Sequence, residues 1–138
     1  MEKYKLEKDI KIMCLPVPAF PNGIQEAFDE LWQKLPRINN RNFYGISYEN
    51  EACEIIYKSA AEEMQDGETE KFGYEPFIII KGDYLIQKIH NWRNQLPSIG
   101  ETFMEMVKDP RMDRAFPCVE WYKTDEEMWC MIRMADHK

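Results

Sequence analysis

The chain has few of the residues that build metal centres and covalent active sites. Its 138 residues include two histidines, His90 and His137, and four cysteines that show no C-x-x-C spacing. Zinc sites need clustered Cys and His ligands, so we expect no metal site. No glycine-rich loop follows a strand pattern, no G-x-S-x-G sequence occurs, and neither histidine has an evident nucleophile beside it. The sequence therefore points away from nucleotide binding, metal-assisted hydrolysis and Ser-His catalysis, and we expect no cofactor.

Long apolar runs and an excess of basic residues are also missing. The N-terminal stretch MEKYKLEKDIKIM is charged throughout, and no apolar run approaches the length of a membrane span. We therefore expect a cytoplasmic protein with reduced cysteines and no membrane partner. The formal net charge of −7 argues against direct nucleic-acid binding, because phosphate contacts need concentrated Lys and Arg.

Aromatic residues and methionine are abundant instead. Aromatics make up 13% of the chain, which also holds nine methionines. Both residue types supply large apolar surface, and methionine adapts its shape to different contacts. This composition is typical of a protein with apolar surfaces that adapt as well as pack.

The first half of the chain reads strand, helix, strand, strand. Residues 10–17 predict a strand, which Pro16 and the following prolines end. A helix is expected to begin after Asn22 as N-cap, with Gln25 in the capping-box position. Two strand-like runs, RNFYGISY over residues 41–48 and ACEIIYKSA over residues 52–60, are joined by the turn sequence ENE and predict a hairpin.

The second half repeats this order after a polar connection over residues 62–75. The strand pattern PFIIIKGDYLIQKI contains Gly82 and Asp83, which indicate a bulge or kink. A helix follows, with Ser98 expected as its cap and Glu101 at the third helical position. A second hairpin closes the pattern, with its turn at TDEE.

This weak internal repetition predicts an α+β fold. We expect two strand–helix–strand–strand modules, over about residues 8–61 and 76–135, related by a pseudo-twofold axis. Their strands would form an antiparallel curved sheet with two main helices and a central ligand cleft. The alternative is one α+β domain whose hairpins resemble each other by chance.

Glu120 is the most informative candidate for chemistry. It stands in the aromatic strand FPCVEWYK, where alternation places it on the same face as Cys118 and Tyr122. A carboxylate in an apolar pocket is costly unless it is paired, and an incoming cation would relieve that cost. Burial would also raise its pKa and suit it to general-acid work. The alternative is a solvated glutamate, or one paired with a Lys or Arg on the neighbouring strand.

Several segments resemble one known family in their order and spacing. FYGISY, EIIYKSAAEE, IIIKGDYLIQKI and PCVEWYKTDEEMWCMI look like the GyrI-like small-molecule-binding family, also called the AraC-type bacterial effector-binding domain. The matching features are Tyr44-Gly45, the G-x-Y strand at Gly82 to Tyr84, and a late P-x-x-E-x-Y strand at Pro117 to Tyr122. The resemblance runs from about residue 10 to residue 134. It implies that residues 1–138 form a single effector-binding domain with a ligand cleft between two modules.

The resemblance also implies a ligand and its site. Family members bind lipophilic, often cationic and aromatic compounds, with the glutamate of the late strand in the pocket. Glu120 takes that position here, and Tyr84 matches the tyrosine of the G-x-Y strand. Together with Tyr122, which shares the face of Glu120, the expected pocket walls are Tyr44, Tyr57, Trp32, Trp92 and Trp129.

Three functions stay open at this point, and binding of a small hydrophobic or cationic molecule is favoured. The chain has no room for the helix-turn-helix of related regulators, so we expect a sensor or sequestration module without a DNA-binding domain. The first alternative is a hydrolase of reactive cyclopropane-bearing compounds, in which Glu120 and Tyr84 would be catalytic. The second is a protein like the inhibitors that bind DNA gyrase. A protein partner, and the choice between monomer and homodimer, are left open.

Overall fold

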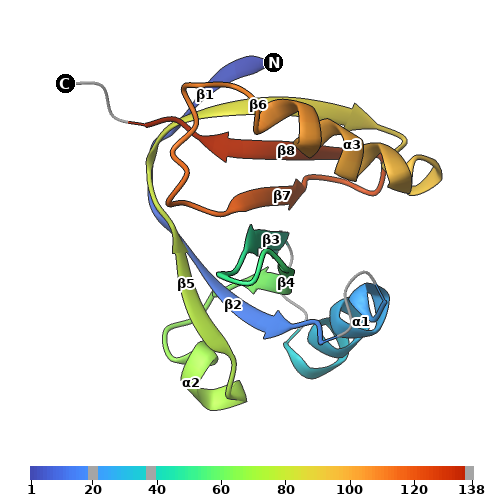
Figure 1. Cartoon of the computed structure of the whole chain (residues 1–138). Coiled ribbons are helices and arrows are strands. Elements are labelled where there is room, and N and C mark those ends of the chain that lie inside the picture. Colours follow the sequence, from blue (N-terminus) through green and yellow to red (C-terminus); the bar gives the residue numbers. More distant parts are fainter. Residues whose placement is uncertain (19–21, 37–39, 136–138) are drawn as a thin grey trace.

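The computed structural model describes residues 1–18, 22–36 and 40–135. In chain order the elements are β1 (Glu2–Leu6), β2 (Ile10–Pro16), α1 (Ile24–Lys34), β3 (Phe43–Glu49), β4 (Ile55–Glu62), α2 (Glu68–Phe72), β5 (Glu75–Ile79), β6 (Gly82–His90), the 3₁₀ turn η1 (Trp92–Asn94), α3 (Leu96–Met106), β7 (Cys118–Tyr122) and β8 (Glu127–Arg133). The strands form one curled antiparallel sheet in the order β1-β6-β8-β7-β3-β4-β2-β5 (Figure 1). Within these residues no helix is long and apolar enough to cross a membrane.

The sheet order confirms the predicted duplication. One module is β2–α1–β3–β4 and the other is β6–α3–β7–β8. In each module the first strand pairs with the last, and the last strand pairs with its hairpin partner. The two modules meet where β3 pairs with β7, with Gly45 opposite Glu120. A pseudo-twofold axis therefore passes between these two central strands.

The symmetry extends to two further strands. β1 precedes β2 but pairs with β6 of the other module, and β5 precedes β6 but pairs with β2. β1 was missed from the sequence because it is short and mostly charged. Its alternation is nevertheless a strand signal, since Tyr4 and Leu6 pack into the core while Lys3 and Lys5 are exposed.

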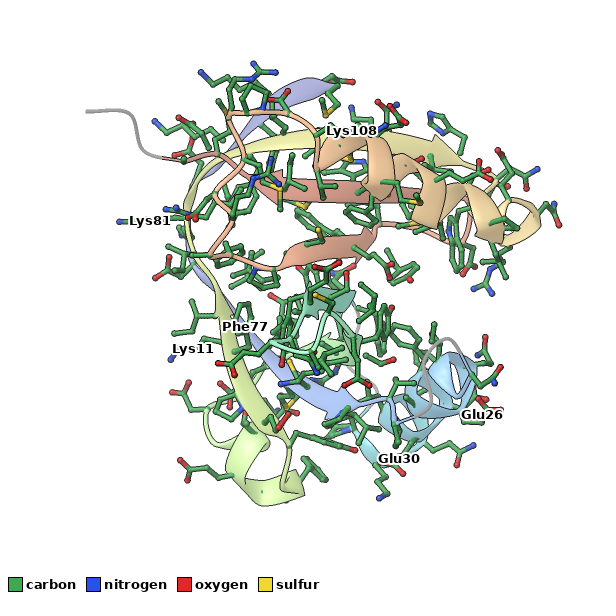
Figure 2. The ribbon with its side chains drawn as sticks, viewed as in Figure 1. Lys11, Glu26, Glu30, Phe77, Lys81 and Lys108 are labelled. Carbon is green, nitrogen blue, oxygen red and sulfur yellow. The ribbon has the colours of Figure 1, made fainter. Side chains whose placement is uncertain are left out.

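Both faces of the sheet carry apolar side chains, and the two helices lie on one of them. Leu31 of α1 packs against Met13 and Ala61, and Met106 of α3 packs against Met128 of β8. The opposite face forms the largest cluster, which includes Tyr44, Tyr84, Ile86, Val119, Trp121 and Trp129. Charged side chains such as Lys11, Lys81 and Lys108 are exposed, and those of Lys11 and Lys81 point away from the sheet in Figure 2.

The predicted start of α1 is wrong in detail. Its N-cap is Gly23, which has φ 97°, and no side-chain cap hydrogen bond forms there. Gln25 donates to Asp29 Oδ1 on the helix surface instead of closing a capping box with Asn22. Glycine adopts this left-handed conformation without the steric cost that a side chain brings, so the turn into the helix is set by the backbone.

The predicted start of α3 is also wrong. The helix begins at Leu96, and Pro97 occupies its first turn, where a missing N–H costs nothing. Ser98 therefore lies inside the helix rather than at its cap. Its carbonyl accepts a hydrogen bond of 2.7 Å from the Thr102 hydroxyl.

The connection over residues 62–75 contains the short helix α2. Gly67 and Gly73 flank it, and both have a left-handed backbone conformation. Glycines are typical of loops, so the sequence predicted a connection without a helix here. Glu68 of α2 is buried and accepts two hydrogen bonds from Arg41, at 2.8 and 3.0 Å. This ion pair joins α2 to the segment that leads into β3. The long strand pattern after residue 75 is two strands, and the break between them falls just before Gly82, which has φ 138°.

Candidate functional site

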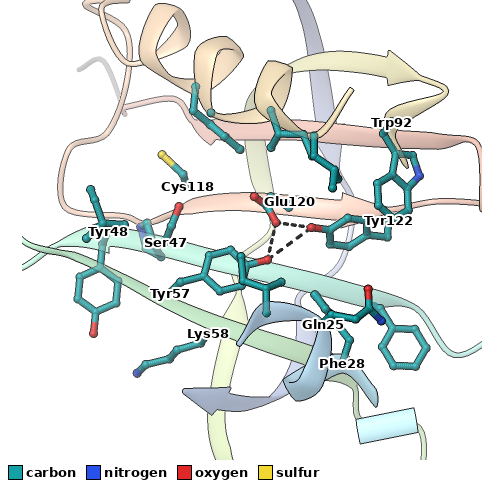
Figure 3. Close-up of a pocket in the computed structure, with 18 of the residues that line it drawn as sticks. Gln25, Phe28, Ser47, Tyr48, Tyr57, Lys58, Trp92, Cys118, Glu120 and Tyr122 are labelled. Atoms are coloured by element: carbon teal, nitrogen blue, oxygen red, sulfur yellow. Dashed lines mark hydrogen bonds between the residues drawn. The ribbon is translucent and has the colours of Figure 1, made fainter. Parts of the chain in front are cut away.

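A large cavity lies over the junction of the two modules. Its volume is about 2110 Å³, and its lining includes residues of α1, α3, β3, β4 and β7. Along β7 the lining residues are Cys118, Glu120 and Tyr122, the face that alternation predicts (Figure 3). Further aromatic lining residues are Phe28, Trp32, Phe43, Tyr48, Tyr57, Phe77, Trp92, Phe103 and Phe116.

Glu120 lies in this cavity with two tyrosine hydroxyls on one of its oxygens. Tyr57 of β4 donates to Glu120 Oε1 at 2.6 Å, and Tyr122 donates to the same atom at 2.5 Å (Figure 3). The two hydroxyl oxygens are 3.4 Å apart. Glu120 is only 8% exposed, so its carboxylate is a buried group whose surroundings decide its charge.

Gly45 makes this arrangement possible. It pairs with Glu120 across β3–β7 and with Ser59 across β3–β4. A Cβ atom at position 45 would overlap both Tyr57 Oη and Glu120 Oε1. The Tyr57 side chain therefore reaches the carboxylate through the space that a side chain on β3 would fill.

The surroundings of Glu120, Tyr57 and Tyr122 keep the tyrosines protonated and stabilise the ionised carboxylate poorly. Burial raises the pKa of Glu120 above its usual range, and the hydrogen bonds from Tyr122 and Tyr57 oppose this only in part. Burial also raises the pKa of Tyr57 and of Tyr122 well above the usual value, so both hydroxyls remain donors. In the part of the chain that the structure describes, no Lys, Arg or His forms an ion pair with Glu120.

Tyr122 is held by aromatic residues of both modules. The Trp92 ring lies 5.0 Å from it, and Trp92 Nε1 donates to the Thr124 carbonyl at 3.2 Å. Phe28 of α1 approaches it in an edge-to-face arrangement at 5.4 Å. These contacts fix one wall of the cavity. Trp32 continues this wall outward, beside Phe43 and 53% exposed.

The structure brings five of the eight sequence-predicted residues to this cavity: Glu120, Tyr122, Tyr57, Trp32 and Trp92. Tyr44, Tyr84 and Trp129 lie in the core on the opposite face of the sheet. Tyr84 donates there to the Ile80 carbonyl at 2.5 Å, and Trp129 packs edge-to-face on Trp121. The family resemblance placed Tyr84 in the pocket, but the side chain of Tyr84 lies on the opposite face of the sheet. The tyrosine that reaches Glu120 from a distant strand is Tyr57.

One further side chain bears on the chemistry of the cavity. Cys118 is a free thiol, and burial, with a smaller effect of Glu120, raises its pKa to about 11. It is therefore a neutral thiol rather than a nucleophilic thiolate near neutral pH. Over residues 1–18, 22–36 and 40–135, no group of three or more His, Cys, Asp and Glu side chains is arranged to hold a metal ion.

Comparisons with known proteins identify the fold. No family model and no curated protein sequence matches the chain. An integron cassette protein from the mobile metagenome of Vibrio cholerae is similar in structure, with a TM-score of 0.74 and 9% identity over 97% of this chain and 95% of that one. SAV2435, solved bound to tetraphenylphosphonium, has a TM-score of 0.63 and 10% identity over 96% and 94% of the two chains.

A hydrolase from Listeria innocua is also similar, with a TM-score of 0.55 and 10% identity over 97% of this chain and 90% of that one. At these identities the likeness concerns the fold. The chain therefore shares a curled, duplicated α+β architecture with proteins that include one solved with a lipophilic cation.

Proposed function

We propose that the chain is a GyrI-like effector-binding domain that binds a lipophilic, aromatic cation in the cavity between its two modules, with Glu120 as the anchor. The observation that carries this proposal is the buried Glu120 carboxylate. It receives two tyrosine hydroxyls, faces an aromatic cavity, and has no ion-pair partner among the described residues.

The cost of burying the carboxylate explains why a cation would bind. An ionised carboxylate removed from water is unfavourable unless a positive charge or several donors compensate it. Two neutral hydroxyls compensate it in part, as the raised pKa of Glu120 indicates. A ligand cation near this group supplies the missing compensation, so part of its binding energy comes from relieving an existing penalty.

The aromatic lining explains why the cation would be lipophilic. Phe28, Tyr57, Trp92 and Tyr122 surround the carboxylate end of the cavity with ring faces and edges. Ring faces attract cations, and the rings also bury the apolar body of a ligand. The likeness to SAV2435, which was solved with tetraphenylphosphonium, supports this class of ligand. In this role the protein senses or sequesters the compound.

Titration with tetraphenylphosphonium tests the proposal. We expect the dissociation constant of Glu120→Gln to be at least about tenfold larger than that of the wild type, because a charge pair in a partly dry site is lost. Glu49→Gln is the matched control, since Glu49 is an exposed carboxylate that lines the same cavity. Its dissociation constant should change less than about twofold, as expected for a screened surface charge. Equal dissociation constants for the wild type and Glu120→Gln would overturn the proposal.

A second candidate is the hydrolase of reactive cyclopropane-bearing compounds. The hydrogen-bonded Glu120–Tyr57–Tyr122 group favours it, because a carboxylate with a raised pKa accepts a proton from water and a nearby tyrosine can donate one. The structural likeness to a hydrolase of Listeria innocua adds support. Tyr57 and Tyr122 then replace Tyr84 in the catalytic role. Turnover of such a compound that is lost in Glu120→Ala would favour this function over binding alone.

A further inference from the structure

The two oxygens of Glu120 have different surroundings. Oε1 accepts both tyrosine hydrogen bonds, at 2.6 and 2.5 Å. Oε2 accepts no hydrogen bond from any residue in the described ranges, and it points away from Tyr57 and Tyr122 in Figure 3. Oε2 is not one of the fully buried polar atoms that lack a hydrogen-bond partner, so it keeps some contact with the open space of the cavity. One half of the carboxylate is thus saturated, and the other half faces the cavity.

The neighbouring side chains do not provide a donor for Oε2. Among the described residues, the titratable groups that interact with Glu120 are Tyr57 of β4, Tyr122 and Cys118 of β7, and Cys130 of β8. Both tyrosines are used on Oε1, and neither thiol forms a hydrogen bond with Glu120 in the described structure. On the helices, the acidic residues that line the cavity are Glu26 and Asp29 of α1. An ionised carboxylate has no hydrogen to donate to Oε2.

Four basic side chains among the described residues line the cavity, and each has contacts away from Glu120. Lys58 pairs with Glu75 at 3.2 Å, and Arg93 pairs with Asp125 at 3.3 Å. Lys123 lies 3.8 Å from the centre of the Trp121 ring. Arg114 is exposed and donates to the Asp109 carbonyl and Met112 Sδ. None of the described residues donates to Oε2, so in the described structure this oxygen is left for a ligand or water.

We propose, on the basis of the function proposed above, that the cavity selects a protonated amine with an aromatic body over a quaternary cation of the same shape, because only the amine has an N–H to donate to Glu120 Oε2. Charge-assisted hydrogen bonds of this kind are short and about twice as strong as neutral ones. A quaternary nitrogen or phosphonium presents only C–H groups, whose hydrogen bonds to oxygen are much weaker. When such a quaternary ligand is bound, Oε2 is hydrogen-bonded only to water or has no hydrogen-bond partner in a partly buried site.

The rest of the cavity restricts the shape of such a ligand. The ammonium lies at Glu120, and the rings of Tyr122, Trp92 and Phe28 lie on one side of it. Leu96 and Met104 of α3 are exposed at the edge of the same cavity. An arylalkyl amine with one ammonium group fits this sequence of contacts, with its ring against Tyr122 and further apolar groups toward α3.

A matched pair of ligands tests the inference. The amine is N,N-dimethyl-(2-naphthylmethyl)amine, which is protonated at pH 7, and the quaternary analogue carries one more methyl group on nitrogen. Dissociation constants are measured by calorimetry for the wild type and for Glu120→Gln. We expect the wild type to bind the amine about tenfold more tightly, a difference typical of one charge-assisted hydrogen bond. We expect the ratio to fall toward one in Glu120→Gln, where both ligands bind more weakly.

The four constants form a cycle that separates the two proposals. Differences in hydration and apolar area between the ligands are present in both proteins, so they cancel in the ratio of ratios. If the wild type binds the quaternary ligand as tightly as the amine, while Glu120→Gln weakens both, this inference is wrong and the proposed function stands. If Glu120→Gln weakens neither ligand, or if the wild type binds neither, both proposals are wrong. The wild-type comparison alone decides the preference if Glu120→Gln does not fold.

Discussion

Gly45 and Glu120 lie opposite each other on the two central strands, and the missing side chain at Gly45 is the space through which Tyr57 reaches Glu120 Oε1. This relationship joins three strands at the pseudo-twofold axis, since Tyr57 is on β4, Gly45 on β3 and Glu120 on β7. It also explains the glycine of the Tyr44-Gly45 pair by packing rather than by backbone conformation.

Gly45→Ala should therefore damage both stability and binding. The new methyl group overlaps the tyrosine oxygen and the carboxylate oxygen, and overpacking of this kind lowers the free energy of unfolding by about 1–3 kcal/mol. Urea unfolding measures this loss. Gly100→Ala in α3 is the control for stability, because nothing lies within 4 Å of its added Cβ and alanine should stabilise a helix by roughly 0.5–1 kcal/mol. Equal unfolding free energies for Gly45→Ala and the wild type would contradict the packing explanation.

Tyrosine-to-phenylalanine changes distinguish the two faces of the sheet. Tyr57→Phe removes one of the two donors that lower the pKa of Glu120, so a smaller fraction of Glu120 is ionised and a lipophilic cation binds more weakly. Tyr84→Phe removes a hydrogen bond to the Ile80 carbonyl on the opposite face, and affinity should stay within experimental error. Calorimetric titration with tetraphenylphosphonium gives both results. A loss of affinity in Tyr84→Phe as large as that in Tyr57→Phe would restore the site expected from the sequence.

Two buried glutamates should give stability opposite dependences on pH. Arg41 and backbone N–H groups lower the pKa of Glu68 from 4.5 to about 2. The stabilisation it contributes is therefore present above pH 4.5 and is lost as the pH falls toward 2. Burial raises the pKa of Glu120. Its contribution is greatest below pH 4.5 and is lost as the pH rises through its folded-state pKa.

Unfolding of Glu68→Gln and Glu120→Gln across this pH range measures the two effects. At pH 7, Glu68→Gln should cost about 3 kcal/mol, since it leaves Arg41 without its charged partner, and the difference from wild type should shrink as the pH falls below 4.5. For Glu120→Gln, the stability of the wild type relative to the variant should decrease as the pH rises. A parallel pH dependence of the two differences would be inconsistent with the assigned environments.

Trp92 should contribute to affinity through its ring. It packs on Tyr122 at the wall of the cavity, so Trp92→Leu should weaken an aromatic cation about tenfold, from lost ring contact and cation–π attraction. Trp129→Phe is the matched change on the opposite face, where the ring packs against Trp121. It should lower the melting temperature and leave the affinity unchanged. The opposite assignment of these two effects would place the ligand on the other face.

Much of this fold could be predicted because the repeat is visible in local patterns. Each helix has periodic apolar residues, and each hairpin has an acidic turn between strands, so the order of the elements and the pseudo-twofold followed. The face of Glu120 also followed, because alternation along β7 needs no long-range information. β1 and α2 did not follow, since a short charged edge strand and a five-residue helix owe their stability to distant partners such as β6 and Arg41.

The partners of Glu120 could be predicted only in part. Tyr122 is two residues away on the same strand, so its position was evident. Tyr57 is 63 residues away in the chain, and it reaches Glu120 because β4 and β7 flank β3 and because position 45 has no side chain. Neither condition is visible in a local pattern. Strand register was also unknown for β6. Tyr84 was therefore expected in the site, whereas its side chain lies in the core on the other face of the sheet.

A pH titration of the Glu120 side-chain carboxyl carbon by NMR, with and without saturating tetraphenylphosphonium, tests the central claim most directly. In the free protein the pKa should lie above the usual glutamate range, because the group is buried. A bound cation beside the carboxylate should lower it by about one pH unit or more. The same pKa in the free and saturated protein would mean that the cation does not bind at Glu120.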